Sequence, residues 1–355
     1  MIHVLAAPAF SNRRHNPYNS LLYEPMAAMD VTVEEYSRRR LLSSRPDIWH
    51  LHWPEAMFSC RSAVRAGLRM GLMLSMLALA RLKGVKICWT MHNLAAHERR
   101  HLWLERLFWP LFTRCLDGYF SLSEAARQAA LARFAALRNL PGRVVLHGHY
   151  RGVYADEVTR EQARQQLGIP PDAAMLLYLG LIRPYKNVPH LIRTFQGWNM
   201  PGAVLCVAGN PNSPELAGEV AAAAAADRRV RTVLEFVPDR DVQLYLRAAD
   251  MAVFPFSEIF NSGSAILALS FDCPVLIPRQ GSMLELQERV GADWVHTYDG
   301  QLTVEILDHA WRWTLGTCRP SRAPLDQLDW RELAAQTVAV YREICHPGPR
   351  GETTP

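Results

Sequence analysis

The chain has 355 residues, of which 49% are hydrophobic and 21% charged, so it exceeds the size at which one core usually stops growing, and two domains are expected. Its formal net charge of +5 favours anionic ligands, but there is no dense basic tract as in a dedicated DNA-binding protein, and no nucleic-acid partner is expected. The seven cysteines stand singly, so the sequence indicates neither a zinc knuckle nor a disulfide framework.

Short β-branched or aromatic runs alternate with longer Ala-, Leu- and Arg-rich stretches along both halves of the chain. This alternation is typical of parallel strands whose connecting helices cover a sheet. The sequence therefore predicts an α/β protein with strands at these runs: HVLAAP (3–8), DIWHLHW (47–53), VKICWTMHN (85–93), GYFSLS (118–123), RVVLHG (143–148), MLLYLGL (175–181), AVLCVAG (203–209), RTVLEFV (231–237), MAVFPF (251–256) and PVLIP (274–278).

A polar helical stretch, 151–172, separates the two sets of strands and closes with a glycine and two prolines. We therefore expect one doubly wound, Rossmann-like domain over 1–152 and a second over 153–329. The late helix at 330–346 is expected to pack back on the N-terminal domain. The Pro- and Gly-rich tail, 347–355, has the composition of a disordered end.

The N-terminal apolar run predicts a strand and not a signal peptide, because it is short and no basic region precedes it. The longest uncharged apolar run, 70–80, is shorter than the roughly 20 residues that cross a bilayer. Together these features predict a cytoplasmic protein without a transmembrane helix.

A polar turn after the strand MAVFPF opens an apolar helix. It contains Glu258, Asn261, Ser262, Gly263 and Ser264. Backbone N–H groups at a helix N-terminus and the helix dipole favour a phosphate, and glycine permits its close approach. The alternative is that Asn261 or Ser262 only caps a buried helix.

Two cations, Arg183 and Lys186, lie in the loop directly after another predicted strand. Cations held at a strand end suit a diphosphate that gains charge as it leaves. The alternative is an ordinary solvated loop. Because ligands bind at the carboxyl ends of the strands in open α/β sheets, this loop and the Ser262 turn can converge on one ligand.

These segments resemble the nucleotide-sugar half of the GT-B glycosyltransferases. The resemblance implies two Rossmann-like domains facing each other across a cleft, with the acceptor on the N-terminal domain and the nucleotide sugar on the C-terminal one. In that family the Arg and Lys hold the donor diphosphate, which implies Arg183 and Lys186 here. The resemblance rests on four segments: GxIRxxKNxxxLIxxF (180–195), VAGN (207–210), YLRAADMAVFPFSE (245–258) and ALSFDCPVLIP (268–278).

The sequence departs from the retaining members of that group. Those members carry two glutamates eight positions apart in this loop and helix. Glu258 stands close to the first, but the second position falls among Ile266, Leu267 and Ala268. The missing carboxylate puts retaining chemistry in doubt.

The segments EIFNSGSAILALS, NPYNSLLYE, HLHWPE and TMHN are most similar to the GumI family of β-mannosyltransferases of xanthan assembly. This resemblance implies GDP-mannose as donor, a diphosphoprenyl-linked oligosaccharide as acceptor and inversion at the anomeric carbon, without a cofactor. We expect His15, Asn16 and Tyr18 to bind the acceptor.

Inversion by single displacement requires a base that takes the proton from the attacking hydroxyl. Three N-terminal side chains lie in suitable loops: Glu55, His92 and His15. Glu55, directly after a strand, is the first choice. His92 is the second and can instead hold the sugar or its phosphate. For each residue a helix cap or a supporting hydrogen bond is the alternative.

The segment PDRD contains an Asp-x-Asp pair, Asp239 and Asp241, of the kind that holds a metal in another glycosyltransferase fold. Here the pair precedes an amphipathic helix, so we expect it to cap that helix, and no metal is expected. The glycine fingerprint of a dinucleotide site and the P-loop signature are absent from the sequence.

Arginines are mixed with aromatic residues over 99–114, a composition that suits the surface of an anionic membrane. The stripe of Leu104, Leu107, Phe108 and Leu111 also fits an ordinary core-facing helix. With the arginines around the apolar run at 70–80, the pattern predicts peripheral attachment to the inner face of the plasma membrane.

Two other functions remain compatible with the sequence. One is a retaining GT-B transferase with another nucleotide sugar, in which Glu258 does the work of the usual pair. The other is a non-catalytic subunit that binds nucleotide sugars within an exopolysaccharide assembly complex, which the missing second glutamate permits.

Overall fold

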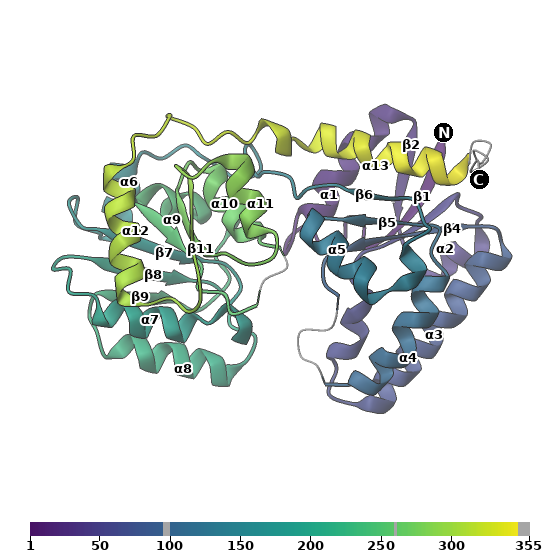
Figure 1. The fold of residues 1–355 in the computed structure, drawn as a ribbon, viewed down its shortest axis with the longest axis horizontal. Helices are drawn as coiled ribbons and strands as arrows, with labels where there is room; N and C mark the ends of the chain where they lie inside the picture. Colours follow the sequence, from purple (N-terminus) through teal and green to yellow (C-terminus); the bar gives the residue numbers. More distant parts are fainter. Residues whose placement is uncertain (95–99, 259–260, 347–355) are drawn as a thin grey trace, which may run out of the picture. The chain divides into compact units, whose positions relative to one another are not determined.

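The chain folds into two compact units, each built on one parallel sheet (Figure 1). Unit 1 comprises Met1–Gly148 together with Leu328–Pro355, and unit 2 comprises His149–Gln327. The late helix therefore belongs to the same unit as the N-terminal strands. Both units are of the α/β class with doubly wound sheets, as the sequence predicts.

The structure is a computed structural model that describes residues 1–94, 100–258 and 261–346. Two expectations from the sequence fall outside these ranges: the tail at 347–355 and the contribution of Arg99 to a basic surface.

The unit 1 sheet has six parallel strands in the order β2-β1-β3-β4-β5-β6. The chain passes from β1 to β2 on one side and then to β3 on the other, so the strand order reverses between β1 and β3. Ligands of such sheets bind beside the carboxyl ends of the strands at this point. The strands are β1 (Ile2–Ala7), β2 (Val31–Glu35), β3 (Ile48–Leu51), β4 (Lys86–Met91), β5 (Gly118–Ser121) and β6 (Gly142–Val144).

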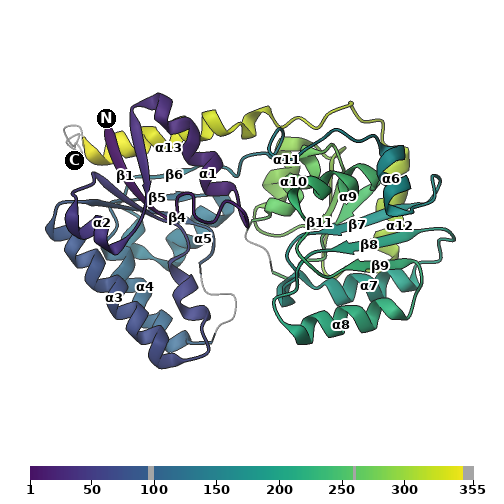
Figure 2. The ribbon, with the colours of Figure 1, turned by 180° about the vertical axis from the view of Figure 1, so that it is seen from behind.

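Helices cover both faces of this sheet, with α3 and α4 on one face and α1 and α13 on the other (Figures 1 and 2). Successive residues of β1 face opposite layers: Leu5 packs with Trp89, whereas Val4 and Ala6 pack with Tyr341. The unit 1 helices are α1 (Tyr18–Tyr23), α2 (Arg38–Ser43), α3 (Ala63–Leu82), α4 (Leu102–Arg114), α5 (Glu124–Arg133) and α13 (Trp330–Cys345), with 3₁₀ turns η1 (Glu24–Met29), η2 (Pro54–Ser59) and η3 (Ala135–Leu137).

The unit 2 sheet has the order β12-β11-β10-β7-β8-β9, which is the strand order of the Rossmann fold and reverses between β7 and β10. Its strands are β7 (Met175–Leu179), β8 (Val204–Ala208), β9 (Val230–Val233), β10 (Met251–Val253), β11 (Val275–Pro278) and β12 (Val295–Tyr298). Its helices are α6 (Arg160–Leu167), α7 (Val188–Gly197), α8 (Pro214–Ala225), α9 (Val242–Ala248), α10 (Gly263–Ser270), α11 (Met283–Val290) and α12 (Val304–Gly316), with 3₁₀ turns η4 (Pro184–Lys186), η5 (Asp239–Asp241) and η6 (Asp326–Leu328, in the segment that leads to α13).

The helix α3 is longer and more exposed than the sequence suggests. It has 20 residues, of which Ala66, Leu77 and Ala80 are buried. By length and composition alone it could cross a membrane. The uncharged run at 70–80 underestimates the length of this helix, because the helix continues through the flanking arginines.

The neighbouring helix α4 differs from the expected membrane pattern at three of its aromatic residues. Phe108, Trp109 and Phe112 are buried in the core, and Leu104 joins them there. Trp103, in contrast, is 58% exposed. Of the predicted stripe, Leu104 and Phe108 therefore face the core, whereas Leu107 and Leu111 are exposed with Trp103 on the other side of the helix.

Candidate functional site

Two histidines meet at the carboxyl ends of neighbouring strands in unit 1. His52 follows β3, His92 follows β4, and His52 Nδ1 lies 2.9 Å from His92 Nε2. Trp53 stacks on the His92 ring with centroids 4.1 Å apart. Burial lowers the pKa of both imidazoles well below the ordinary value, so both rings are neutral at pH 7.

Glu55 lies in the first turn of η2 and is 5% exposed. Its Oε1 accepts a hydrogen bond of 2.9 Å from Asn93 Nδ2, whereas Oε2 is buried without a hydrogen-bond partner among the described residues. Burial raises the pKa of this carboxyl to about 7, although the Asn93 hydrogen bond lowers it. A carboxylate with this pKa can accept a proton near neutral pH, which is what a general base requires.

These residues form one cluster, which we call the unit 1 site: His52, Trp53, Glu55, His92 and Asn93. Asn93 is adjacent to His92 in the chain and bonds to Glu55, so both residues expected to be catalytic belong to this cluster. The cluster lies beside the point where the strand order reverses, as topology predicts for a ligand site.

The residues expected to bind the acceptor lie in and after the loop that follows β1, and they differ in exposure. His15 is exposed, and Asn16 Oδ1 accepts a hydrogen bond of 3.1 Å from the Tyr18 N–H. Tyr18 is 1% exposed, with its ring centroid 4.9 Å from that of His92 and 5.4 Å from that of Trp330. Tyr18 therefore packs behind His92 and supports that ring.

In unit 2 the segments after β7 and β8 approach each other so closely that both require glycine. A Cβ on Gly209, which has φ 155°, would lie 1.8 Å from the carbonyl oxygen of Gly180. A Cβ on Gly180, at φ 141°, would lie 2.5 Å from Ser264 Oγ and 3.7 Å from Lys186 Nζ. The ammonium of Lys186 and the start of α10 therefore meet at this point.

The two loops singled out in the sequence are joined here. Ser257 donates both its N–H, at 2.9 Å, and its hydroxyl, at 3.0 Å, to the carbonyl oxygen of Tyr185. Lys186 Nζ lies 5.5 Å from the ring centre of Phe256, and burial together with the charge of Arg183 lowers the pKa of Lys186 to about 8. The loop after β7 and the loop after β10 thus converge, and Lys186 is partly buried where they meet. We call Gly180, Arg183, Lys186 and the 261–264 turn the unit 2 site.

The start of α10 combines a cap with open donors. Ser262 is its N-cap and accepts a hydrogen bond of 3.1 Å from the Ala265 N–H, so the capping role considered for this serine is confirmed. Gly263 and Ser264 are the first two helical residues, whose N–H groups have no acceptor within a helix. Asn261 Nδ2 is buried without a hydrogen-bond partner among the described residues.

Glu258 is exposed, and no second carboxylate accompanies it in α10. Ile266 and Ala268 are buried in the core of unit 2, and Leu267 is partly buried. The position at which retaining enzymes are expected to carry a glutamate is thus occupied by apolar packing.

The aspartates of the PDRD segment do not cap α9 as expected. Asp241 occupies the N-cap position, but its side chain makes no capping hydrogen bond. The turn is closed instead by the backbone, through the Asp241 N–H and the carbonyl of Pro238 at 2.8 Å. Within the described ranges, no group of three or more His, Cys, Asp or Glu side chains is arranged to hold a metal ion.

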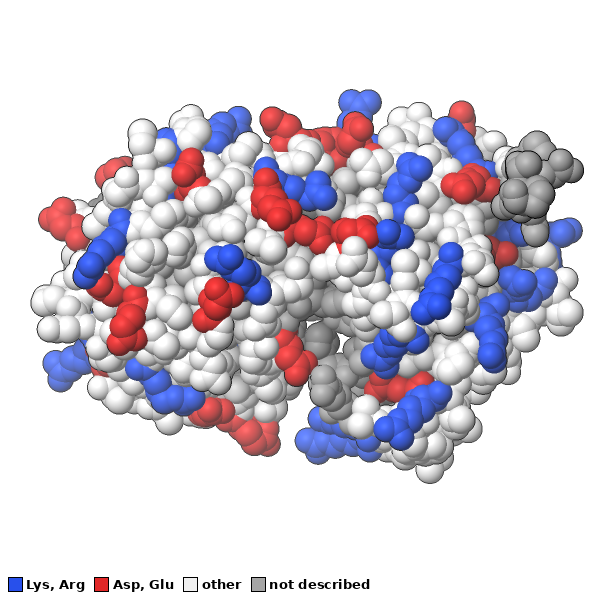
Figure 3. Space-filling view, in the orientation of Figure 1, with Lys and Arg blue, Asp and Glu red and all other residues white. Residues whose placement is uncertain are grey.

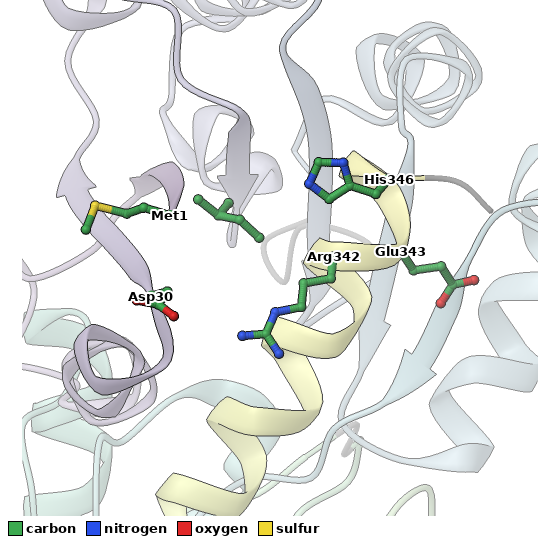
Figure 4. Close-up of a pocket in the computed structure, with 6 residues that line it drawn as sticks. Met1, Asp30, Arg342, Glu343 and His346 are labelled. Carbon is green, nitrogen blue, oxygen red and sulfur yellow. The ribbon is translucent and has the colours of Figure 1, made fainter.

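A pocket of about 500 Å³ opens elsewhere in unit 1, between the start of β1 and the end of α13 (Figure 4). Arg342 extends toward the side of Asp30, whereas Glu343 points away. Because β1 begins at this pocket, the pocket lies at the amino ends of the strands, whereas the unit 1 site lies at their carboxyl ends. It is lined by Met1, Ile2, Asp30, Arg342, Glu343 and His346.

Several residues of the two sites were not predicted from the sequence. His50 and His52 alternate along β3, as Thr90 and His92 do along β4, so each pair faces one side of the sheet. That period of two was a usable signal. No pattern in the sequence indicated Tyr341, because 291 residues separate it from its partner His50.

Comparison with known proteins identifies the family. The model for glycosyl transferases group 1 matches residues 159–287, within unit 2. A GDP-mannose:glycolipid 4-beta-D-mannosyltransferase from Xanthomonas campestris pv. campestris is 31% identical over 342 residues, which cover 96% of this chain and 92% of that protein. D-inositol 3-phosphate glycosyltransferase 2 from Catenulispora acidiphila is 33% identical over 135 residues, 35% of this chain and 31% of that one.

Solved structures agree on the fold. Sucrose-phosphate synthase from Thermosynechococcus elongatus superposes with a TM-score of 0.67 at 16% identity, covering 98% of this chain and 100% of that one. WaaG, a glycosyltransferase involved in lipopolysaccharide biosynthesis, gives 0.57 at 13% identity, with the same coverage. The chain is therefore a glycosyltransferase of the GT-B fold and belongs to the glycosyl transferases group 1 family.

Proposed function

We propose that this enzyme transfers mannose from GDP-mannose to a diphosphoprenyl-linked oligosaccharide, with inversion and a β-linkage, in xanthan-like exopolysaccharide assembly. The observation that carries this proposal is the 31% identity, over 96% of the chain, to the Xanthomonas enzyme, whose name specifies GDP-mannose and a glycolipid. A match of that extent includes both units, so it bears on the donor and the acceptor side alike.

The donor diphosphate binds to the unit 2 site in this proposal. Lys186 and Arg183 neutralise its charge, and the N–H groups of Gly263 and Ser264 donate to its oxygens at the positive end of α10. Ser262 and Asn261 shape the turn, and Glu258 lies at its edge, within reach of a bound nucleotide sugar. Since the cations supply the countercharge, the proposed reaction requires no metal and no cofactor. Anabaena HepE, of similar fold, has been solved with UDP and glucose.

Glu55 is the proposed general base. The acceptor hydroxyl oxygen attacks C1 of mannose while its proton passes to the Glu55 carboxylate. The bond from C1 to the diphosphate oxygen breaks, and GDP leaves with the electron pair, stabilised by Lys186 and Arg183. The raised pKa of Glu55 and the apolar residues at 266 and 268 both support a single displacement. His92 contacts the substrate from the same cluster.

The acceptor binds to unit 1, where His15 and Asn16 line the loop after β1 and Tyr18 supports the site from behind. A lipid-linked acceptor remains in its membrane, so the enzyme must reach that surface. We therefore propose that unit 1 attaches peripherally to the inner face of the plasma membrane and that the protein is otherwise cytoplasmic.

The proposed membrane contact, which we call the α3–α4 surface, combines apolar and basic side chains. Figure 3 shows blue side chains spread among white ones over the part of unit 1 formed by these helices. Such a mixture suits anionic headgroups above an apolar boundary. Its exposed apolar residues are Val64, Leu68, Leu72, Leu82, Leu102, Trp103, Leu107 and Leu111. Its exposed arginines are Arg61, Arg65, Arg69, Arg81, Arg100, Arg106 and Arg114.

The test is turnover of GDP-mannose by the purified full chain with a lipid-linked oligosaccharide, compared with UDP- and ADP-sugars. We expect release of GDP and a β-configured product by NMR, both lost in Lys186→Ala. An α-configured product would overturn inversion, and turnover of another nucleotide sugar alone would overturn the donor assignment. GDP binding without transfer to any lipid acceptor would favour a non-catalytic subunit.

A further inference from the structure

A chain of hydrogen-bonded rings extends from His92 into the interior of unit 1. His92 Nε2 lies 2.9 Å from His52 Nδ1, and His52 Nε2 lies 2.5 Å from the hydroxyl of Tyr23. His92 is partly exposed, whereas His52 and Tyr23 are buried. Since Nε2 of His92 is engaged by His52, Nδ1 is the ring nitrogen left for a substrate.

The chain continues to a second histidine and to the C-terminal helix. His50 Nδ1 lies 2.5 Å from the hydroxyl of Tyr341 and 3.0 Å from that of Tyr23. On the other side of the ring, His50 Nε2 lies 2.8 Å from Thr90 Oγ1. Both nitrogens of His50 therefore have partners, one of which comes from α13.

The protonation of every ring in this chain follows from its burial. Burial lowers the pKa of His50 to about 3 and those of His52 and His92 well below the ordinary value, so each imidazole has one N–H and one bare nitrogen at pH 7. Burial raises the pKa of Tyr23 and Tyr341, so each hydroxyl keeps one proton to donate.

The two contacts of 2.5 Å favour the direction in which each tyrosine donates to a histidine, because a phenol is the stronger donor and a bare imidazole nitrogen the stronger acceptor. If Tyr341 donates to His50 Nδ1, that nitrogen is bare and the His50 Nε2–H donates to Thr90. Tyr23 then donates to Nε2 of His52, which leaves the His52 hydrogen on Nδ1, directed at Nε2 of His92. In the reverse direction His52 Nε2–H would donate to Tyr23, Tyr23 to Tyr341 and Tyr341 to His50 Nδ1, which would place the hydrogen of His92 on Nε2.

We infer that Tyr23 and Tyr341 are positioning residues that set the tautomers of the three histidines, so that His92 presents an Nδ1–H donor to the substrate. Its Nε2 is occupied by His52 and its Nδ1 already carries hydrogen. His92 therefore donates a hydrogen bond to a sugar or phosphate oxygen and does not take the proton of the attacking hydroxyl. This inference rests on the proposed function, within which it separates the role of His92 from that of Glu55.

Two nearly isosteric variants separate donor from base. In His92→Asn the amide N–H₂ takes about the place of Nδ1–H and can donate, whereas in His92→Asp a carboxylate oxygen there can only accept. We expect kcat/KM to stay within about tenfold of wild type in His92→Asn and to fall at least a hundredfold in His92→Asp. The opposite order, or an equal loss in two variants of unchanged Tm, would overturn the inference.

The tautomer can also be read without any substrate. In the free protein with ¹⁵N-labelled histidine, long-range ¹H–¹⁵N correlation is expected to show His92 as the Nδ1–H form, with its signals identified by their loss in His92→Asn. Tyr23→Phe should change that form, whereas Tyr36→Phe, which alters a ring stacked on Trp49 outside the chain, should leave it. An Nε2–H form in the wild type would overturn the inference. Failure to turn over GDP-mannose would instead refute the proposed function, and it would leave the spectrum of the free protein unchanged.

Discussion

Asn93 donates a hydrogen bond of 2.9 Å to Oε1 of Glu55, and this contact opposes the rise in pKa that burial imposes on the carboxyl. In Asn93→Ala the pKa of Glu55 should move above about 7. Since a general base acts in its ionised form, the acidic limb of the kcat/KM profile should then shift to higher pH, with less loss at pH 9 than at pH 7. The pH profiles of kcat/KM for wild type and for Asn93→Ala check this prediction. Glu55→Gln is the control and should lose at least a hundredfold in kcat at every pH, and an unshifted limb in Asn93→Ala would contradict the assignment of the base.

The same carboxyl also affects stability. Its pKa in the folded chain, about 7, exceeds the reference value of 4.5, so between these pH values the folded state binds more protons than the unfolded state. The free energy of unfolding should therefore fall as pH rises through this window, by up to about 3 kcal/mol. We expect Glu55→Gln to be more stable than wild type at pH 8 and similar at pH 4.5, measured by urea denaturation. Equal stability at both pH values would show that Glu55 is not buried in solution.

The parallel sheets could be predicted from the sequence because their central strands are continuous apolar runs. Two of the four edge strands, β6 and β9, could be predicted as well, but β2 and β12 could not. The segment VTVEE of β2 is buried only at Val31, so its pattern is too polar to be distinguished from a loop. As an edge strand β2 has one neighbour instead of two, and its composition reflects that exposure.

The candidate sites were predictable to the extent that they lie directly after strands. Glu55, His92 and Lys186 all follow this rule. The contact of Tyr341 with His50 and the close approach of Gly209 to Gly180 could not be predicted, because both depend on how elements distant in sequence pack together. The buried aromatic residues of α4 show the same limit, because helical periodicity locates an apolar stripe but does not say which side faces the sheet.

Lys186 should make donor binding depend on pH. Burial beside Arg183 lowers the pKa of this lysine to about 8, so the ammonium is charged at pH 7 and largely neutral at pH 9 in the free enzyme. We expect the affinity for GDP, measured by calorimetry, to fall about tenfold between these values. Lys186→Arg, which remains charged at pH 9, should lose much less affinity for GDP over this range. Because guanine titrates equally in both experiments, this variant also controls for the ionisation of the base. If the affinity for GDP falls equally in wild type and in Lys186→Arg, Lys186 does not belong to the diphosphate site.

Gly209 should not tolerate a side chain. A methyl group there would lie 1.8 Å from the backbone oxygen of Gly180, which cannot move without shifting the loop that carries Lys186. Gly209→Ala is expected to cost about 3 kcal/mol or more and to weaken GDP binding. Gly218→Ala, in a helix with nothing within 4 Å of the added carbon, should instead stabilise by roughly 0.5–1 kcal/mol. Thermal unfolding checks both, and an unchanged Tm in Gly209→Ala would refute the close approach.

The α3–α4 surface should bind anionic membranes through charge and apolar area together. Each arginine near such a surface contributes about 1 kcal/mol, so Arg100→Glu with Arg106→Glu should weaken binding to phosphatidylglycerol vesicles at least thirtyfold. Trp103→Ala should weaken it further, because the exposed ring can enter the headgroup region. The matched control is Arg228→Glu with Arg322→Glu, two exposed positions of unit 2 that carry the same change in charge. Vesicle flotation measures all three proteins. If the control loses as much binding as the α3–α4 variant, attachment depends on net charge alone and this surface is not the membrane contact.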